Sequence, residues 1–250
     1  ELEAEAMHLP PPPQLRLGPE GFDLIAEIKL ASPSAGQLAG DADGIEARAA
    51  AYAGEGVCAV SVLTEPDRFG GSLDHLARAA RTLEPFEVPA MAKDFLMDPA
   101  QICAARLAGA GGALLIIRML DDERLAMMLE QAARLRMFVL LEAFDEGDLE
   151  RAGALDVAGT QAPVLLGLNC RDLRTLAVNP ARFESLADRF PPGFVRVAES
   201  GIEGPGDASS VAELGYPVAL VGTALMRAPD PTAAIRGMLE AGRHGAQASA

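Results

Sequence analysis

The sequence predicts a single closed (β/α)8 barrel, the TIM-barrel architecture, with a short N-terminal extension. Eight short segments rich in apolar and β-branched residues recur along the chain, and their first residues lie 23 to 33 positions apart. Amphipathic stretches with helix-start signals separate them. Strands that alternate with helices form parallel sheets. Eight such units within 250 residues fit one closed barrel.

The predicted strands are the first of these observations. They lie at residues 24–29, 57–64, 88–94, 112–119, 137–144, 163–169, 195–200 and 218–225. Most are nearly continuous apolar runs, which is typical of sheets that are covered on both faces. An open doubly wound sheet is the structural alternative, but no GxGxxG motif follows the first strand.

Helix-start signals follow several of the predicted strands. Asp98 is expected to cap a helix that begins at Pro99. Acidic residues open the stretches at 121–136 and 145–155, where the helix dipole favours negative charge. No internal linker is visible. The predicted organisation is an N-terminal extension over 1–23, a barrel over 24–243 and a C-terminal tail over 244–250.

Composition argues against several classes of protein. The formal net charge of −15 is unlike that of nucleic-acid-binding proteins, which carry basic stripes. No apolar run reaches the ~18 residues of a membrane-spanning helix, and the acidic N-terminus is no signal peptide. Three widely spaced cysteines, Cys58, Cys103 and Cys170, indicate reduced thiols in a cytoplasmic protein. The three histidines are scattered, so no metal site is expected.

Polar side chains gather at the predicted carboxyl ends of the strands, where barrel enzymes place their chemistry. They are Glu27, Lys29, Lys93, Asp94, Glu142, Asn169, Glu199 and Ser200. The chain has 19 arginines but only two lysines, and both lysines belong to this set. A buried lysine can be tuned toward neutral pKa, whereas arginine stays charged. The set therefore indicates a catalytic rim, with a structural cluster of ion pairs as the alternative.

Two glycine-rich loops predict a phosphate site. ESGIEGPGD (199–207) lies at the end of the seventh strand, and VGTALMR (221–227) at the end of the eighth. Phosphate-binding barrels use these two loops, whose backbone N–H groups point at the ligand. Hydroxyl groups of SPSAG (32–36), after the first strand, would add donors. Because the net charge repels anions at long range, such a site needs local positive charge.

Seven stretches, in order along the chain, resemble the indole-3-glycerol-phosphate synthase family. They are IAEIKLASPSAG (25–36), AVSVLTEPDRFGGS (59–72), MAKDF (91–95), LLEAFDEGDL (140–149), GLNCRDLRTL (167–176), AESGI (198–202) and VGTALMRAPDP (221–231). The resemblance implies cyclisation of 1-(2-carboxyphenylamino)-1-deoxyribulose 5-phosphate to indole-3-glycerol phosphate in tryptophan biosynthesis. Carbon dioxide and water are lost, and no cofactor is used. An association with other enzymes of that pathway stays open.

The resemblance also implies roles for residues in the matching motifs. Lys93 would be the general acid that protonates the substrate carbonyl, and Glu142 the acid/base of the later dehydration. The other catalytic positions are Glu27, Lys29, Asn169 and Glu199. The substrate-binding positions are Ser32, Ser34, Phe95, Leu114, Arg171 and Ser200, among which Phe95 and Leu114 form an apolar wall. The phosphate-binding positions are Lys29, Gly201, Gly222 and Thr223.

The chain departs from the family pattern at three places. Ala35 and Ala92 stand where many members carry a basic residue, which removes two cations near an anionic substrate. Residues 1–23 are shorter than the family's N-terminal segment, whose extra helix covers the barrel mouth, so an incomplete lid is expected.

Two other functions stay open at this point. One is another phosphate-binding barrel enzyme, such as phosphoribosylanthranilate isomerase, although that family ends the first strand with a catalytic cysteine rather than with Glu27 and Lys29. The other is a catalytically weak or silent barrel that only binds a phosphorylated ligand, which the missing cations and the short N-terminus would favour.

Overall fold

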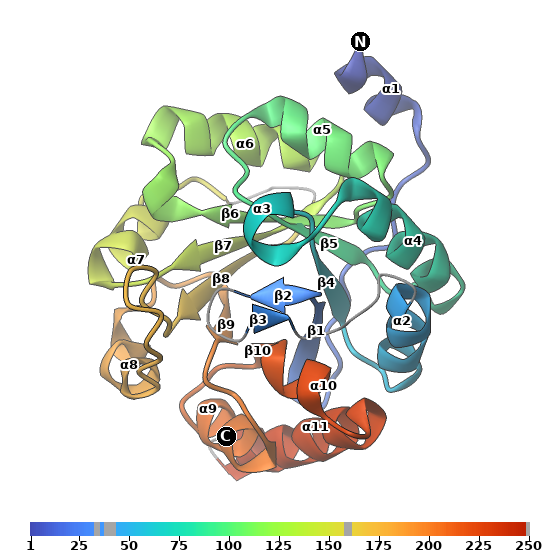
Figure 1. The fold of residues 1–250 in the computed structure, drawn as a ribbon. Helices are drawn as coiled ribbons and strands as arrows, with labels where there is room; N and C mark the ends of the chain where they lie inside the picture. The colour runs from blue at the N-terminus through green and yellow to red at the C-terminus, as the bar shows by residue number, and fades with distance from the viewer. Residues whose placement is uncertain (33–35, 38–43, 158–161, 249–250) are drawn as a thin grey trace.

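Eight parallel strands close into a barrel in the computed structural model, which describes residues 1–32, 36–37, 44–157 and 162–248 (Figure 1). The strands are β1 (Asp23–Ile28), β4 (Ala59–Leu63), β5 (Ala90–Lys93), β6 (Gly112–Ile116), β7 (Phe138–Ala143), β8 (Val164–Asn169), β9 (Val195–Glu199) and β10 (Val218–Val221). β1 pairs in parallel with both β4 and β10, which closes the sheet. The predicted barrel is thereby confirmed, and the open sheet is excluded.

Helices surround the barrel on its outer side, and the short helix α3 lies at the mouth (Figure 1). They are α2 (Ile45–Gly54), α3 (Pro66–Phe69), α4 (Leu73–Leu83), α5 (Pro99–Leu107), α6 (Asp122–Arg134), α7 (Glu146–Gly153), α8 (Ala181–Ser185), α9 (Pro205–Glu213), α10 (Thr223–Arg227) and α11 (Pro231–Ala248). The expected cap is confirmed at α5, where the Asp98 carboxylate accepts the backbone N–H of Ala100. Asp121 and Asp145 cap α6 and α7 in the same way.

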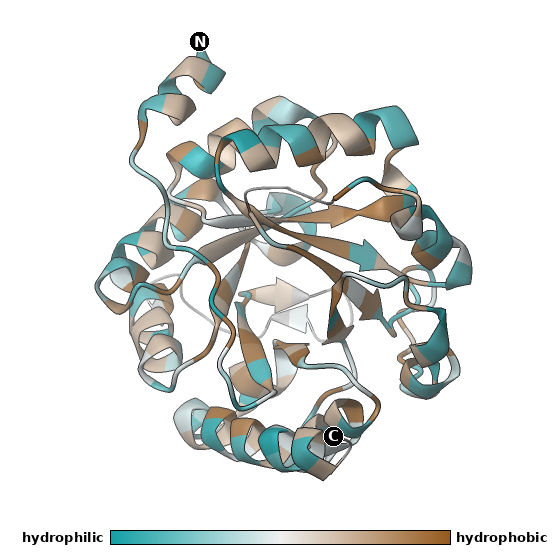
Figure 2. Cartoon of the chain, turned by 180° about the vertical axis from the view of Figure 1, so that it is seen from behind, coloured by the Kyte–Doolittle hydropathy of each residue, from teal (hydrophilic) through white to brown (hydrophobic). Residues whose placement is uncertain are grey.

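Two apolar cores follow from the alternation of side chains along each strand. Outward-facing residues such as Leu24, Ala92 and Leu141 pack against the helices. Inward-facing residues such as Ile25, Met91 and Leu140 fill the barrel interior. Figure 2 shows the result, because the strands are brown along most of their length whereas the helices alternate between brown and teal. This double burial explains the nearly continuous apolar runs of the sequence.

The N-terminal segment lies against the amino-terminal end and the side of the barrel (Figure 2). Helix α1 (Leu2–His8) packs on α5, and Glu3 pairs with Arg134 in the last turn of α6 at 2.6 Å. Leu15 joins the apolar cluster inside the barrel, which also contains Phe138 at the start of β7. Residues 1–22 therefore cover the end opposite to the mouth and one side of the barrel. This position differs from the expected lid, because these contacts lie away from the mouth.

The carboxyl-terminal boundary also differs from the prediction. Residues 244–248 continue α11, in which the His244 ring contacts the carbonyl oxygen of Glu240 at 2.9 Å, rather than forming a tail. At the mouth, β2 (Ala31–Ser32) and β3 (Gly36–Gln37) form a short hairpin after β1. Within the described ranges, every helix is too short or too polar to cross a membrane.

Candidate active site

A cavity of about 510 Å³ opens at the carboxyl ends of the strands. Its lining includes nearly all the described residues that the sequence singles out: Glu27, Lys29, Lys93, Phe95, Leu114, Glu142, Asn169, Arg171, Glu199, Ser200, Gly201, Gly222 and Thr223. Their convergence follows from the period of two along a strand. Glu142, for example, lies two residues after the inward-facing Leu140, and Lys93 two after Met91.

Lys93 lines this cavity and lies among three carboxylates. Its Nζ is 3.2 Å from Glu142 Oε2 and 3.8 Å from Glu199 Oε2. Burial alone would lower the pKa of Lys93, but the charges of Glu142, Glu199 and Glu27 outweigh it and raise the pKa above the ordinary value. From the sequence we predict a lysine whose pKa is lowered toward neutrality. The structure corrects that expectation, because acids rather than cations surround the amine.

Glu27 and Lys29 form a second ion pair. Glu27 lies on β1 and Lys29 directly follows the strand, two residues later on the same face. Lys29 Nζ donates to Glu27 Oε1 at 2.5 Å, and both side chains are largely buried. Burial raises the pKa of Glu27, yet the charges of Lys29 and Lys93 more than offset this and hold the pKa below its usual value. Glu27 is therefore an anion that links the two lysines electrostatically.

Glu199 is the least compensated acid of the site. It is 1% exposed, and neither carboxylate oxygen has a hydrogen-bond partner among the described residues. Burial, followed by the charge of Glu142, raises the pKa of Glu199 well above its ordinary value, against the smaller influence of Lys93. An unsatisfied buried carboxylate destabilises a fold, so its presence at the cavity indicates a functional demand.

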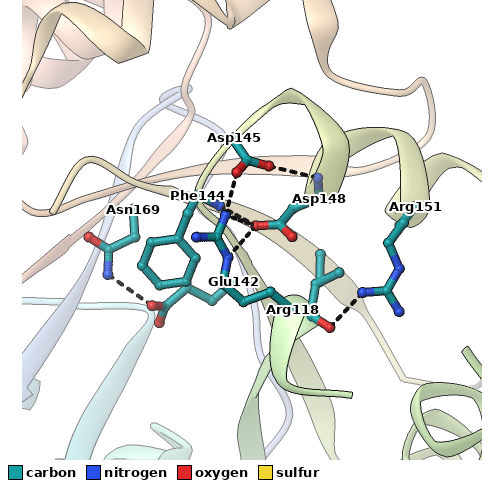
Figure 3. A network of polar contacts seen from close by, with 8 residues as sticks. Arg118, Glu142, Phe144, Asp145, Asp148, Arg151 and Asn169 are labelled. Atoms are coloured by element: carbon teal, nitrogen blue, oxygen red, sulfur yellow. Dashed lines mark hydrogen bonds and ion pairs between the residues drawn. The ribbon is translucent and has the colours of Figure 1, made fainter. Parts of the chain in front are cut away.

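Asn169 connects three of the predicted residues. Its Nδ2 donates to Glu142 Oε1 at 2.9 Å (Figure 3), and its Oδ1 accepts from Ser200 Oγ at 2.9 Å. The same Oδ1 accepts the backbone N–H of Arg171 at 2.9 Å. Ser200 holds a φ of 66°, a left-handed conformation that costs a non-glycine residue energy. The network thus orients one face of the Glu142 carboxylate.

The predicted phosphate residues lie at one side of the cavity, on the loops after β9 and β10. Gly201, Gly222 and Thr223 line it, and Arg227 of α10 lines it as well. A side chain on Gly222 would overlap Glu27 Oε1 and would lie 2.9 Å from Lys29 Nζ. Gly222 therefore also makes room for the Glu27–Lys29 pair, a role that sequence reasoning did not include.

The apolar wall is wider than the sequence indicated. Phe95 and Leu114 line the cavity as expected, and Leu63, Phe69, Ile116, Leu173, Val178, Ile202 and Leu220 join them. Ile116, two residues after Leu114 on β6, could have been found from the strand period alone. Asp94 also lines the cavity, and it accepts a hydrogen bond from Thr64 Oγ1 at 2.7 Å, which ties the end of β5 to the end of β4.

The two alanine departures have different outcomes. Ala92 faces outward into the core between strands and helices, so a longer side chain at this position would start from the far side of the strand. Ala35 and Ser34 lie outside the described residues, and Ser32 is placed only by its backbone in β2. Within the described ranges, no three His, Cys, Asp or Glu side chains gather in a way that could hold a metal ion.

Comparison with known proteins places this site in a family. The family model for indole-3-glycerol phosphate synthase matches residues 6–238. The chain is a member of the indole-3-glycerol phosphate synthase family. The enzyme of that name from Micrococcus luteus is 44% identical over 223 residues, covering 88% of this chain and 79% of the relative. The one from Streptomyces griseus is 41% identical over 225 residues, covering 90% and 80%.

Solved structures add the fold. The 3-hexulose-6-phosphate synthase of Salmonella typhimurium superposes with a TM-score of 0.65 at 15% sequence identity, covering 90% of this chain and all of that one. At this identity the likeness concerns the barrel architecture only. The family match of the sequence argues against the phosphoribosylanthranilate isomerase alternative. The end of β1 agrees with this, because it carries an acid and an amine rather than a cysteine.

Proposed function

We propose that this chain acts as an indole-3-glycerol-phosphate synthase, a carboxy-lyase that converts 1-(2-carboxyphenylamino)-1-deoxyribulose 5-phosphate to indole-3-glycerol phosphate, carbon dioxide and water. Family membership supports the reaction. The observation that carries the assignment to this site is the position of Lys93, whose ammonium group lies in the mouth of the barrel within 4 Å of two carboxylates.

Lys93 supplies the first proton. Its raised pKa keeps the amine charged across neutral pH, so the proton is present when substrate binds. As the aromatic carbon attacks the ketone carbon, the carbonyl oxygen becomes a strongly basic alkoxide, and the nearby ammonium can then donate to it. The neighbouring carboxylates hold the ammonium group in place until that moment.

Glu142 transfers protons in the later dehydration step. After decarboxylation restores the aromatic ring, the hydroxyl group must leave as water, which needs one proton delivered and one removed. Glu142 lies between the Lys93 amine and the Asn169 amide and can exchange protons with the former. Glu199, which has the raised pKa, is the group that can hold a proton nearby.

Binding rests on local positive charge and an apolar wall. Lys29, Arg171 and Arg227 line the cavity, although the chain as a whole is acidic. The proposed phosphate position is the side formed by Gly201, Gly222 and Thr223, and the aromatic ring would lie against Phe95 and Leu114. The three buried, free thiols fit the reducing cytoplasm that we propose as the location.

The experiment is direct. Purified protein is incubated with the carboxyphenylamino substrate, and indole fluorescence and released carbon dioxide are followed together. We expect equal amounts of both products. Binding of the substrate without turnover would instead support the silent-barrel alternative. Conversion of the substrate without carbon dioxide release would support an isomerase.

A further inference from the structure

Arg118 belongs to a polar cluster beside the site. The proposed reaction gives this cluster no role. It lies in the 3-10 helix η3 (Ile117–Met119), directly after β6. Its Nε and NH2 donate to Asp148 Oδ2 at 2.9 and 2.6 Å, and NH2 also donates to Asp145 Oδ2 at 2.7 Å (Figure 3). The guanidinium group lies over the Phe144 ring, 4.5 Å from its centroid.

The cluster connects β6, β7 and α7. Asp148 Oδ2, which accepts from Arg118, also accepts the backbone N–H of Phe144 at 2.8 Å. Asp148 is buried, and its own N–H is held by the capping carboxylate of Asp145. One arginine thereby holds both the backbone and the ring of Phe144, the residue that directly follows β7.

Phe144 is two residues beyond Glu142, and the same face of the chain carries both. Its ring belongs to the apolar cluster of the barrel interior, which also contains the cavity-lining Leu114 and Ile116. Figure 3 labels Phe144 and Glu142 together at the end of β7, with the Phe144 ring beside the Arg118 guanidinium group. Movement of the end of β7 would change the distances from Glu142 to Lys93 and to Asn169.

We propose that Arg118 is a positioning residue for Glu142. It acts through Asp148 and Phe144, so that the carboxylate stays at hydrogen-bonding distance from both of its partners. This inference rests on the proposed role of Glu142. The planar guanidinium group is suited to the task because it donates to two carboxylates and stacks on the ring at once, which a lysine ammonium cannot do. A displacement of about 1 Å can cost up to ~10²-fold in rate.

The chain offers a matched control in Arg151. This residue of α7 also binds the segment after β6: it donates to Asp122 Oδ1 at 2.6 Å and to the carbonyl oxygens of Ile117 and Leu120 at 2.9 and 2.8 Å. Within the described part of the chain, no hydrogen bond or ion pair joins Arg151 to Phe144 or Glu142. Loss of Arg151 should therefore weaken the same region of the fold without releasing the end of β7.

The test compares kcat, KM and the melting temperature of Arg118→Lys, Arg118→Met and Arg151→Met. We expect Arg118→Met to lower kcat about tenfold with KM within about twofold, whereas Arg151→Met keeps kcat within about twofold. Arg118→Lys should behave like Arg118→Met, because the fork is lost although the charge remains, and it replaces Arg118→Met if that variant does not fold. Equal kcat values for the Arg118 and Arg151 variants would overturn the inference.

A double variant separates this inference from the proposed function. If Arg118 acts through Glu142, Arg118→Met should lower kcat in the wild-type background and cause no further loss in Glu142→Gln. A full additional loss in that background would contradict the proposed route. Retained turnover of Glu142→Gln by itself would instead remove the proposed role of Glu142 and, with it, the target of Arg118.

Discussion

Gly167 on β8 and Glu199 on β9 compete for the same space inside the barrel. A β-carbon on residue 167 would overlap Glu199 Oε1, so the buried carboxylate fits only because its neighbour has no side chain. Gly222, directly after β10, stands in the same relation to Glu27. These two glycines thus create the volume that two buried acids of the site occupy.

The first prediction follows from this overlap. Gly167→Ala should push the Glu199 carboxylate away from Lys93 and lower turnover by about tenfold or more. Gly206→Ala in α9 is the control, because nothing lies within 4 Å of its new methyl group. That variant should be unchanged in kcat and slightly stabilised, by about 0.5–1 kcal/mol. Equal kinetics of the two variants would mean that Glu199 is not needed where it lies.

Lys93→Met tests the proposed general acid. We expect turnover to fall by about 10²-fold or more, the scale of a lost general acid. Removing the amine also leaves Glu142 and Glu199 without their common cation, so circular dichroism must confirm the fold. Lys93→Arg serves as the second variant, since it keeps the charge. Near-normal turnover in a folded Lys93→Met protein would remove Lys93 from the mechanism.

Glu142→Gln preserves shape and removes the ionisable group. The late proton step should fail, so kcat should fall far more than substrate affinity. Asn169 can still hydrogen-bond the amide oxygen, which keeps the side chain in place. Kinetics across a range of substrate concentrations separate the two parameters. A rise in KM alone would make Glu142 a binding residue.

Glu199→Gln should stabilise the protein, and this stabilisation should grow as the pH rises. The pKa of Glu199 is raised above its ordinary value of 4.5, so its favourable contribution is complete below that value and is lost as pH rises through the folded-state pKa. The variant and wild type should therefore melt at similar temperatures below about pH 4.5. At higher pH the melting temperature of the variant should exceed that of the wild type, by roughly 2–4 °C for each ~1 kcal/mol of added unfolding free energy. A constant difference at all pH values would contradict the burial of an uncompensated charge.

The same variant should move the alkaline limb of the pH–rate profile. Glu199 is one of the carboxylates that raise the pKa of Lys93. Without it, Lys93 should lose its proton at lower pH. The alkaline limb of the kcat/KM profile should therefore shift to lower pH. An unchanged limb would mean that it reports a group other than Lys93.

Arg227→Met tests the phosphate position. Inorganic phosphate should inhibit the wild type competitively, and the variant should show a higher KM and weaker inhibition. Arg174→Met, on the exposed loop after β8, removes the same charge from a residue that does not line the cavity, and it should change neither value. Gly222→Val is unsuitable for this purpose, because its side chain would displace Glu27 and Lys29. Non-competitive inhibition of the wild type would place the phosphate elsewhere.

Local features of the sequence were sufficient for the barrel and for the location of the rim. The eight strands emerge from apolar runs of the right spacing, since burial on both faces leaves a signal that does not depend on distant partners. Polar residues at the ends of these apolar runs are recognisable in the same local way, and they include Glu27, Lys93, Glu142 and Glu199.

Only the tertiary structure decided how these groups influence one another. The Lys93 pKa is raised rather than lowered because three carboxylates from other strands surround it, and no single segment contains that information. The bottom position of residues 1–22, the outward side of Ala92, and the clearance that Gly167 and Gly222 provide are likewise relations between segments distant in sequence. Electrostatics and packing act through space, so the sequence by itself determines which groups are present, and the closure of the barrel decides which of them meet.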